Sequence, residues 1–153
     1  MSANPDDPIP FEEVRQLGEQ LLEILRDCNP SLDYDEQSIE WLEGYIGRNR
    51  GSLSEDKRYG WAIGIGYVIG ETMIASFGGK WEYDLPQQVW LVAIGPPVGK
   101  ANPIAKAYKC LSGPYDSIAS MLRITRTVIE KGGWDKIGTR LSQGEADLAQ
   151  SDE

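Results

Sequence analysis

The feature that most constrains the fold is an apolar, glycine-rich run in the middle of the chain. Residues 60–70 read GWAIGIGYVIG and hold no charged side chain. Apolar residues fall on nearly every side of a helix drawn through this run, which predicts a helix buried on most sides. The helix is expected to begin near Ser52 or Ser54 and to end at Phe77, before Gly78-Gly79. A buried strand is the alternative, and the length of the apolar pattern favours the helix.

The four glycines of this run need a structural reason. Each costs about 1 kcal/mol relative to alanine inside a helix. Gly60 and Gly64 are four residues apart, as are Gly66 and Gly70, so each pair is expected to form a flat strip against a neighbouring element. The run is too short and too rich in glycine to cross a bilayer, and Glu71 follows it. We therefore expect a core helix and no membrane span.

Two amphipathic helices are predicted before this run. The first should extend from about Phe11 to Cys28, because apolar residues recur there at steps of three and four. Its expected apolar face comprises Phe11, Val14, Leu17, Leu21, Ile24, Leu25 and Cys28. The second should begin at Asp33 as N-cap, with Glu36 completing a capping box, and should end near Gly51.

After the apolar helix the hydrophobic period changes from helical to two. Strands are predicted at 80–84, 88–94 and, after Pro103, 104–111. A fourth helix is predicted from about Pro114 to Lys131. The expected fold class is therefore α+β, with three N-terminal helices, a small three-stranded antiparallel sheet and a fourth helix packed on the sheet.

The length of 153 residues suits one domain, which we place at residues 11–134. Residues 1–10 are expected to form a flexible N-terminus. They contain Asp6 and Asp7 and no basic residue, which argues against a secretory signal. Residues 135–153 are rich in Ser, Gln, Gly, Glu and Asp, so we expect a disordered acidic tail.

The net charge of −9 is unevenly distributed along the chain. Acidic residues predominate at both ends and in the second predicted helix, whereas residues 57–134 carry a surplus of four positive charges. Non-specific nucleic-acid binding needs a concentrated basic surface, so a nucleic-acid partner is not expected.

The sequence contains no histidine and only two cysteines, Cys28 and Cys110. The usual general base and the Ser-His and Cys-His nucleophile pairs are therefore absent, as is a structural zinc site. We predict a non-enzymatic protein with no catalytic residue, no metal and no cofactor. Two isolated cysteines are interpreted as free thiols, which is typical of a cytoplasmic protein.

One group of residues is a candidate binding site: Glu71, Trp81, Lys106 and Lys109. Glu71 follows the most buried helical run at its C-terminal end, where the helix dipole disfavours an anion. Buried carboxylates usually have a partner, so we expect an ion pair with Lys106 or Lys109. A functional acid is the alternative. Trp41, at the flank of the second helix, is a further candidate because five Trp and seven Tyr suit an interface.

Several of these positions carry a resemblance to a known family. The residues concerned are Gly70-Glu71, Gly78-Gly79-Lys80-Trp81, Pro103, Lys106, Lys109, Leu111, Gly113 and Asp116-Ser117. This pattern resembles a mostly bacterial family of domains of unknown function, marked by a Gly-Gly-x-Trp motif and a later Pro/Lys segment. The resemblance covers about residues 58–130. It implies a bacterial protein with helices on a small antiparallel sheet, and it supplies no activity.

Two functions are compatible with the sequence. The first is a non-catalytic protein-binding module of immunity, adaptor or regulatory type, whose partner is another protein. The second is a small-molecule or anion-binding domain that uses Lys100, Lys106 and Lys109, with possible weak enzymatic activity from Glu71. A deep pocket beside the sheet lined by these residues would favour the second function. A flat patch bearing tryptophan would favour the first.

Overall fold

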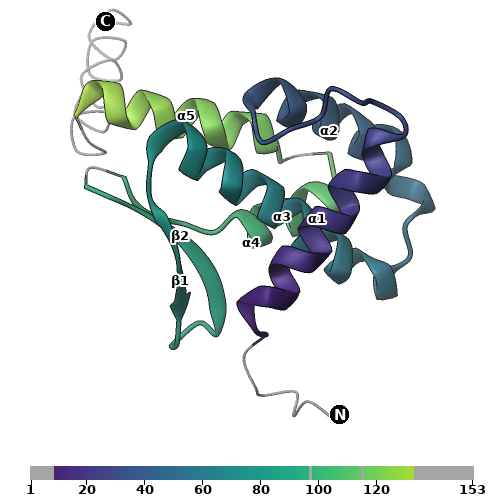
Figure 1. Ribbon diagram of the computed structural model, residues 1–153, viewed down its shortest axis with the longest axis horizontal. Helices are drawn as coiled ribbons and strands as arrows, with labels where there is room; N and C mark the ends of the chain where they lie inside the picture. Colours follow the sequence, from purple (N-terminus) through teal and green to yellow (C-terminus); the bar gives the residue numbers. More distant parts are fainter. Residues whose placement is uncertain (1–8, 97, 115, 133–153) are drawn as a thin grey trace, which may run out of the picture.

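Helix α3 (Glu55–Phe77) runs through the centre of the molecule, as the apolar run predicts. In the computed structural model, which describes residues 9–96, 98–114 and 116–132, every residue from 62 to 70 is buried. Helices α1 (Phe11–Arg26) and α4 (Pro103–Ser112) pack along α3 (Figure 1). By length and composition α3 is the one described helix able to cross a membrane, but 61% of its most apolar window is buried. It is therefore a core helix of this fold.

Three of the four glycines in α3 lie at close contacts. A Cβ on Gly66 would lie 2.6 Å from Ile104 of α4, and one on Gly70 would overlap the indole of Trp81. A Cβ on Gly64 would lie 3.1 Å from the Leu17 carbonyl oxygen of α1. The prediction of close approach is confirmed at these positions. It is wrong for Gly60, where no atom lies within 4 Å of the position a Cβ would take.

The two helices that precede α3 differ in detail from the predicted ones. Helix α1 ends at Arg26, and Cys28 is exposed. Ile24, expected on the buried face, is 64% exposed. Helix α2 (Glu36–Asn49) has Asp35 as its N-cap, whose carboxylate accepts a hydrogen bond from the Ser38 amide at 2.8 Å. The predicted cap at Asp33 was therefore wrong by two residues. A short 3-10 helix, η1 (Arg50–Ser52), leads from α2 toward α3.

The sheet has the order β1-β2-β3 and is antiparallel throughout. Its strands are β1 (Lys80–Asp84), β2 (Val89–Gly95) and β3 (Gly99–Ala101). In the β1–β2 hairpin Trp81 pairs with Val92 and Tyr83 with Trp90. The Trp90 indole also donates a hydrogen bond to the Ile9 carbonyl at 2.7 Å, so the sheet holds the segment that leads into α1.

The predicted third strand at 104–111 is wrong, because this segment forms α4. Asn102 caps the helix by accepting a hydrogen bond from the Ala105 amide at 3.0 Å, and Pro103 occupies the first turn. The buried residues Ile104, Ala107 and Leu111 recur at steps of three and four, which is the spacing of a helix face. The third strand lies earlier, in the short segment 99–101.

The α+β class is confirmed, with three helices before a three-stranded antiparallel sheet and α4 after it, packed against β2. The helix predicted from Pro114 is a fifth helix, α5 (Ile118–Lys131), which packs mainly on α2 (Figure 1). Cys28 and Cys110 are both free thiols, as predicted. Residues 1–8 and the predicted tail at 135–153 lie outside the described residues.

Candidate functional site

Glu71 is held by an aromatic side chain and not by a lysine. Its carboxylate accepts a hydrogen bond from the Trp81 indole nitrogen at 3.1 Å. The ring of Tyr67 stacks on that indole, with centroids 6.0 Å apart and planes 2° from parallel. Burial raises the pKa of the Tyr67 hydroxyl, and the negative charge of Glu71 raises it further. These contacts tie β1 to the C-terminal half of α3, so Glu71 has a structural role there.

The predicted ion pair between Glu71 and a lysine was wrong. Because residues 103–112 form a helix and not a strand, Lys106 and Lys109 lie off the face of α4 that contacts the core. The ammonium group of Lys106 instead lies 2.7 Å from the Asp116 carboxylate, and this hydrogen bond holds the pKa of Asp116 below its usual value. Lys109 forms no ion pair with any residue that the structure describes.

The five candidate residues therefore occupy three separate places. Glu71 and Trp81 lie together between α3 and β1. Lys106 and Lys109 line a cleft of about 450 Å³, which Lys100 of β3 also lines. Trp41 is partly buried on α2 and stacks on Tyr45, with ring centroids 5.3 Å apart and planes 20° from parallel.

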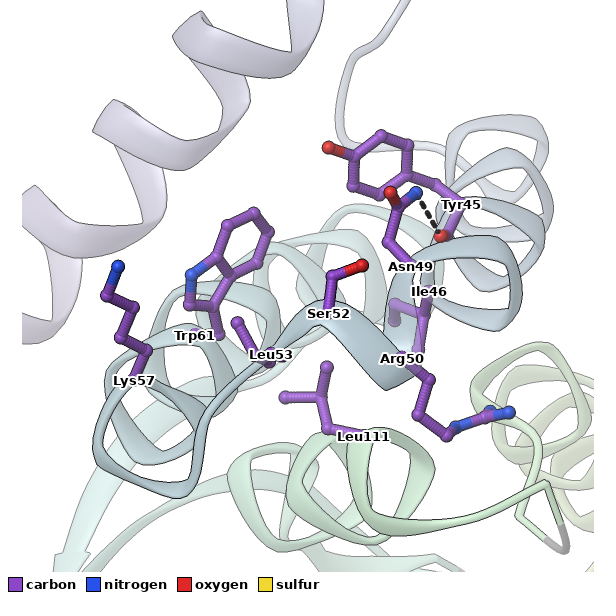
Figure 2. A pocket seen from close by; sticks show the side chains of 9 residues that line it. All are labelled: Tyr45, Ile46, Asn49, Arg50, Ser52, Leu53, Lys57, Trp61 and Leu111. Atoms are coloured by element: carbon purple, nitrogen blue, oxygen red, sulfur yellow. Dashed lines mark hydrogen bonds between the residues drawn. The ribbon is translucent and has the colours of Figure 1, made fainter.

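A second surface feature was not predicted and lies around Trp61. One pocket of about 260 Å³ opens between α2, η1 and α3, and Figure 2 shows the Trp61 indole standing beside Lys57 and Leu53 at its edge. A second pocket of about 340 Å³ lies between α1 and α3. Lys57 and Trp61 line both pockets, so the two adjoin at these side chains.

We name these two neighbouring pockets, taken together, the Trp61 furrow. Its lining residues are Leu17, Gln20, Leu21, Ile24, Tyr45, Ile46, Asn49, Arg50, Ser52, Leu53, Lys57, Gly60, Trp61, Gly64 and Leu111. Most are apolar or aromatic, and the charged ones are the cations Arg50 and Lys57. The Arg50 guanidinium donates a hydrogen bond to the Cys110 carbonyl at 2.9 Å, which fixes its position at the furrow wall.

Two sequence signals could have located the furrow. The apolar residues of α1 are more numerous than one buried face can hold, and Ile24 is the one left exposed. Gly60 is a glycine inside a helix with no contact to account for it. Both residues line the same pocket between α1 and α3. The furrow therefore lies where the sequence pattern and the packing disagree.

Comparison with known proteins gives no relative. No protein-family model matches this chain, and the curated proteins and solved structures show no significant similarity to it. The resemblance to the Gly-Gly-x-Trp family stays a prediction. In this structure the motif closes α3 and starts the sheet: Gly78 and Gly79 have φ of 80° and 123°, which favour glycine, and Trp81 packs on Gly70.

The candidate sites contain no metal cluster. Across residues 9–96, 98–114 and 116–132, no group of three or more His, Cys, Asp or Glu side chains is placed to hold a metal ion. What the surface offers is an apolar furrow with a tryptophan and two cations, and a separate cleft lined by three lysines. The cleft contains the three lysines expected for the small-molecule function but not Glu71, and the surface around Trp61 bears the tryptophan expected for the protein-binding function but is hollowed and not flat.

Proposed function

We propose that this domain is a non-catalytic protein-binding module that docks an acidic, amphipathic helix of another protein in the Trp61 furrow. The observation that carries the proposal is that two apolar pockets adjoin at one partly buried tryptophan. Tryptophan is enriched among the residues that dominate binding energy, particularly where apolar walls exclude water around it. The furrow offers such walls from α1, α2 and α3.

The charge of the furrow supports an acidic partner. The chain has a net charge of −9, yet the charged residues that line the furrow, Arg50 and Lys57, are both cationic. Neither forms a salt bridge within the described part of the chain. A partner with acidic side chains beside its apolar ones would therefore be attracted to the furrow and oriented in it.

The shape of the furrow favours a helical segment. It follows the N-terminal half of α3, between α1 on one side and α2 with η1 on the other. An amphipathic helix that lies in a groove presents apolar side chains at positions i, i+4 and i+7. The two pockets on either side of Trp61 are suited to successive side chains of such a stripe.

Gly60 supplies an independent argument for an occupied furrow. A glycine inside a helix costs about 1 kcal/mol relative to alanine, and here no close contact offsets that cost. Any side chain at position 60 would extend into the pocket between α1 and α3. The glycine is explained if this space is filled by a partner.

The proposed setting is the bacterial cytoplasm. Cys28 is exposed and both cysteines are free thiols, which supports a reducing compartment. The bacterial origin rests on the resemblance to the Gly-Gly-x-Trp family. Immunity, adaptor and regulatory proteins are the types of binding module that these features suit.

The test is selection of binding partners from a library of random peptides displayed on their own messenger RNA, with the full chain immobilised. Selected peptides should carry apolar residues at helical spacing flanked by Asp or Glu. Trp61→Ala should weaken the binding of such a peptide about 30-fold, because a central tryptophan is worth 2 kcal/mol or more. Tyr108→Ala, which removes a 41% exposed aromatic from α4, is the matched control and should change nothing.

Three results would contradict the proposal. Selected peptides could bind Trp61→Ala as tightly as the unmodified chain. Basic peptides could be enriched in place of acidic ones. Finally, the unmodified chain could be a dimer that Trp61→Ala converts to a monomer, which would make a second copy the occupant of the furrow.

A further inference from the structure

The cleft lined by lysines is separate from the Trp61 furrow. We name it the lysine cleft and define it by Lys100 of β3, Lys106 and Lys109 of α4, and Met121 and Ile124 of α5. Its volume of about 450 Å³ falls in the range of small-molecule sites, about 300–1,000 Å³. Helix α4 brings two of the lysines to one side, since residues three apart share a helix face.

The electrostatics of the cleft favour an anion. Lys100 lies 3.7 Å from Glu82, and Lys106 lies 2.7 Å from Asp116. Lys109 forms no such pair with a described residue, and no carboxylate is among the residues that line the cleft. The cleft is therefore lined by three ammonium groups, while the carboxylates that pair with two of them, Glu82 and Asp116, are not among its lining residues.

The cleft also has apolar lining. Met121 and Ile124 of α5 line it together with the lysines, and Ile124 is 50% exposed. The hydroxyl of Thr125 donates a hydrogen bond to the Met121 carbonyl at 2.7 Å, so it is already used within α5. A ligand matched to the cleft would therefore combine an anionic group, which pairs with the lysines, with an apolar body, which covers Met121 and Ile124.

We infer that the lysine cleft binds a small amphipathic anion, namely a carboxylate or phosphate monoester with an apolar body. The anionic group would lie at Lys106 and Lys109, where ammonium groups can donate charge-assisted hydrogen bonds. The apolar body would cover Met121 and Ile124 and remove their exposed surface from water. This site does not depend on the Trp61 furrow, so either proposal can fail without the other.

The experiment uses octanoate and octyl phosphate as probes, titrated against the full chain with isotope-labelled methyl groups. The expected result is a saturable change in the NMR signals of Met121 and Ile124 with at least one probe. The probe that binds with the lower dissociation constant identifies the preferred head group, carboxylate or phosphate. Octanol, which lacks the charge, and inorganic phosphate, which lacks the apolar body, should each bind at least tenfold more weakly, as both interactions contribute.

Variants then test the role of the lysine. Lys109 is exposed, so Lys109→Gln should keep the fold, which thermal unfolding would verify. This change should weaken binding of the probe about tenfold, the effect of losing one charge-assisted hydrogen bond. Lys131→Gln, on an exposed lysine at the end of α5, is the matched control and should leave binding unchanged.

Any of three results would overturn the inference. Neither probe might change the Met121 and Ile124 signals. Lys109→Gln might bind as tightly as the unmodified chain. Changes confined to Leu21 and Ile24 would place the probe in the Trp61 furrow and not in the lysine cleft.

Discussion

The two ends of α3 use the same residue type in opposite ways. Toward the C-terminus, Gly66 and Gly70 are covered by Ile104 and by the Trp81 ring, so glycine is required for packing. Toward the N-terminus, Gly60 faces open space and lines the Trp61 furrow. Glycine in a buried-looking helix therefore does not by itself indicate close packing. Where a glycine lacks a neighbour, it marks a place that the fold leaves unfilled.

Aromatic residues repeat this contrast. Trp81, at the closed end, stacks on Tyr67 and donates its indole hydrogen to Glu71. Trp61, at the open end, forms no ring pair with a described aromatic residue and lines both pockets of the furrow. Trp81 closes the fold, whereas Trp61 packs on the core and also lines the furrow, where the proposed function places it against the partner.

The largest expected effect comes from adding a side chain at the closed end. Gly70→Leu should destabilise the fold by about 3 kcal/mol, because the new side chain would overlap the Trp81 indole. Gly60→Leu is the matched change at the open end and should not destabilise the fold, because helix propensity improves and the side chain would extend into open space. Urea unfolding of the two variants measures both values. Equal losses would show that the two ends of α3 do not differ.

Removing the acceptor at Glu71 should have the next largest effect. Glu71→Leu should cost about 1–3 kcal/mol, because the Trp81 indole would lose its hydrogen-bond partner. Glu71→Gln keeps an acceptor oxygen and should cost less than about 1 kcal/mol. Denaturant unfolding of the two variants shows whether the Trp81 indole needs only a hydrogen-bond acceptor at position 71 or needs a negative charge there. Equal losses from both would indicate that the charge matters, contrary to the structure.

A smaller effect of opposite sign is expected from alanine at Gly60. Gly60→Ala should stabilise the fold by about 0.5–1 kcal/mol, because helix propensity improves and nothing obstructs the methyl group. Gly64→Ala is the paired variant, and its methyl group would lie 3.1 Å from the Leu17 carbonyl, which should cancel the gain. Differential scanning calorimetry would measure a rise of roughly 2–4 °C for the first variant. A similar rise in Gly64→Ala would remove the distinction between the two positions.

The smallest expected effect concerns the charges of α4, in contrast to its packing on the closed end of α3. Hydrogen bonding from Lys106 lowers the pKa of Asp116 in the folded state, so the contribution of this ion pair to stability is present above the unfolded pKa. It should be lost as the pH falls through the folded pKa. The unmodified chain should therefore exceed Asp116→Asn slightly in stability at pH 7, and the difference should vanish in strong acid. A difference that persists in acid would point to a role other than ion pairing.

The sequence predicted the parts of the fold whose hydrophobic period is unambiguous. The apolar run of α3, the alternation in β1 and the buried strand β2 each specify one type of element. Segment 104–111 was assigned to a strand, although Asn102-Pro103 is also the start signal of a helix. That one error also displaced Lys106 and Lys109, and so produced the wrong partner for Glu71.

The candidate sites were harder to predict than the helices and strands. The partner of Glu71 depends on where β1 crosses α3, which no local pattern encodes. The Trp61 furrow exists because side chains from α1, α2 and α3 fail to fill the space between them, and periodicity describes only what is buried. The exposed Ile24 and the uncontacted Gly60 become informative once the neighbouring helices are known.

The hydrogen bond from Trp90 to the Ile9 carbonyl bears on how this domain is best immobilised on a support. It anchors the chain at the sheet just before α1 begins, at the opposite end of that helix from Leu21 and Ile24. A tether joined ahead of Ile9 would pull on the hairpin and would leave the Trp61 furrow facing solution. Immobilisation through this end is therefore the orientation of choice for binding measurements, because Leu21 and Ile24 lie at the other end of α1.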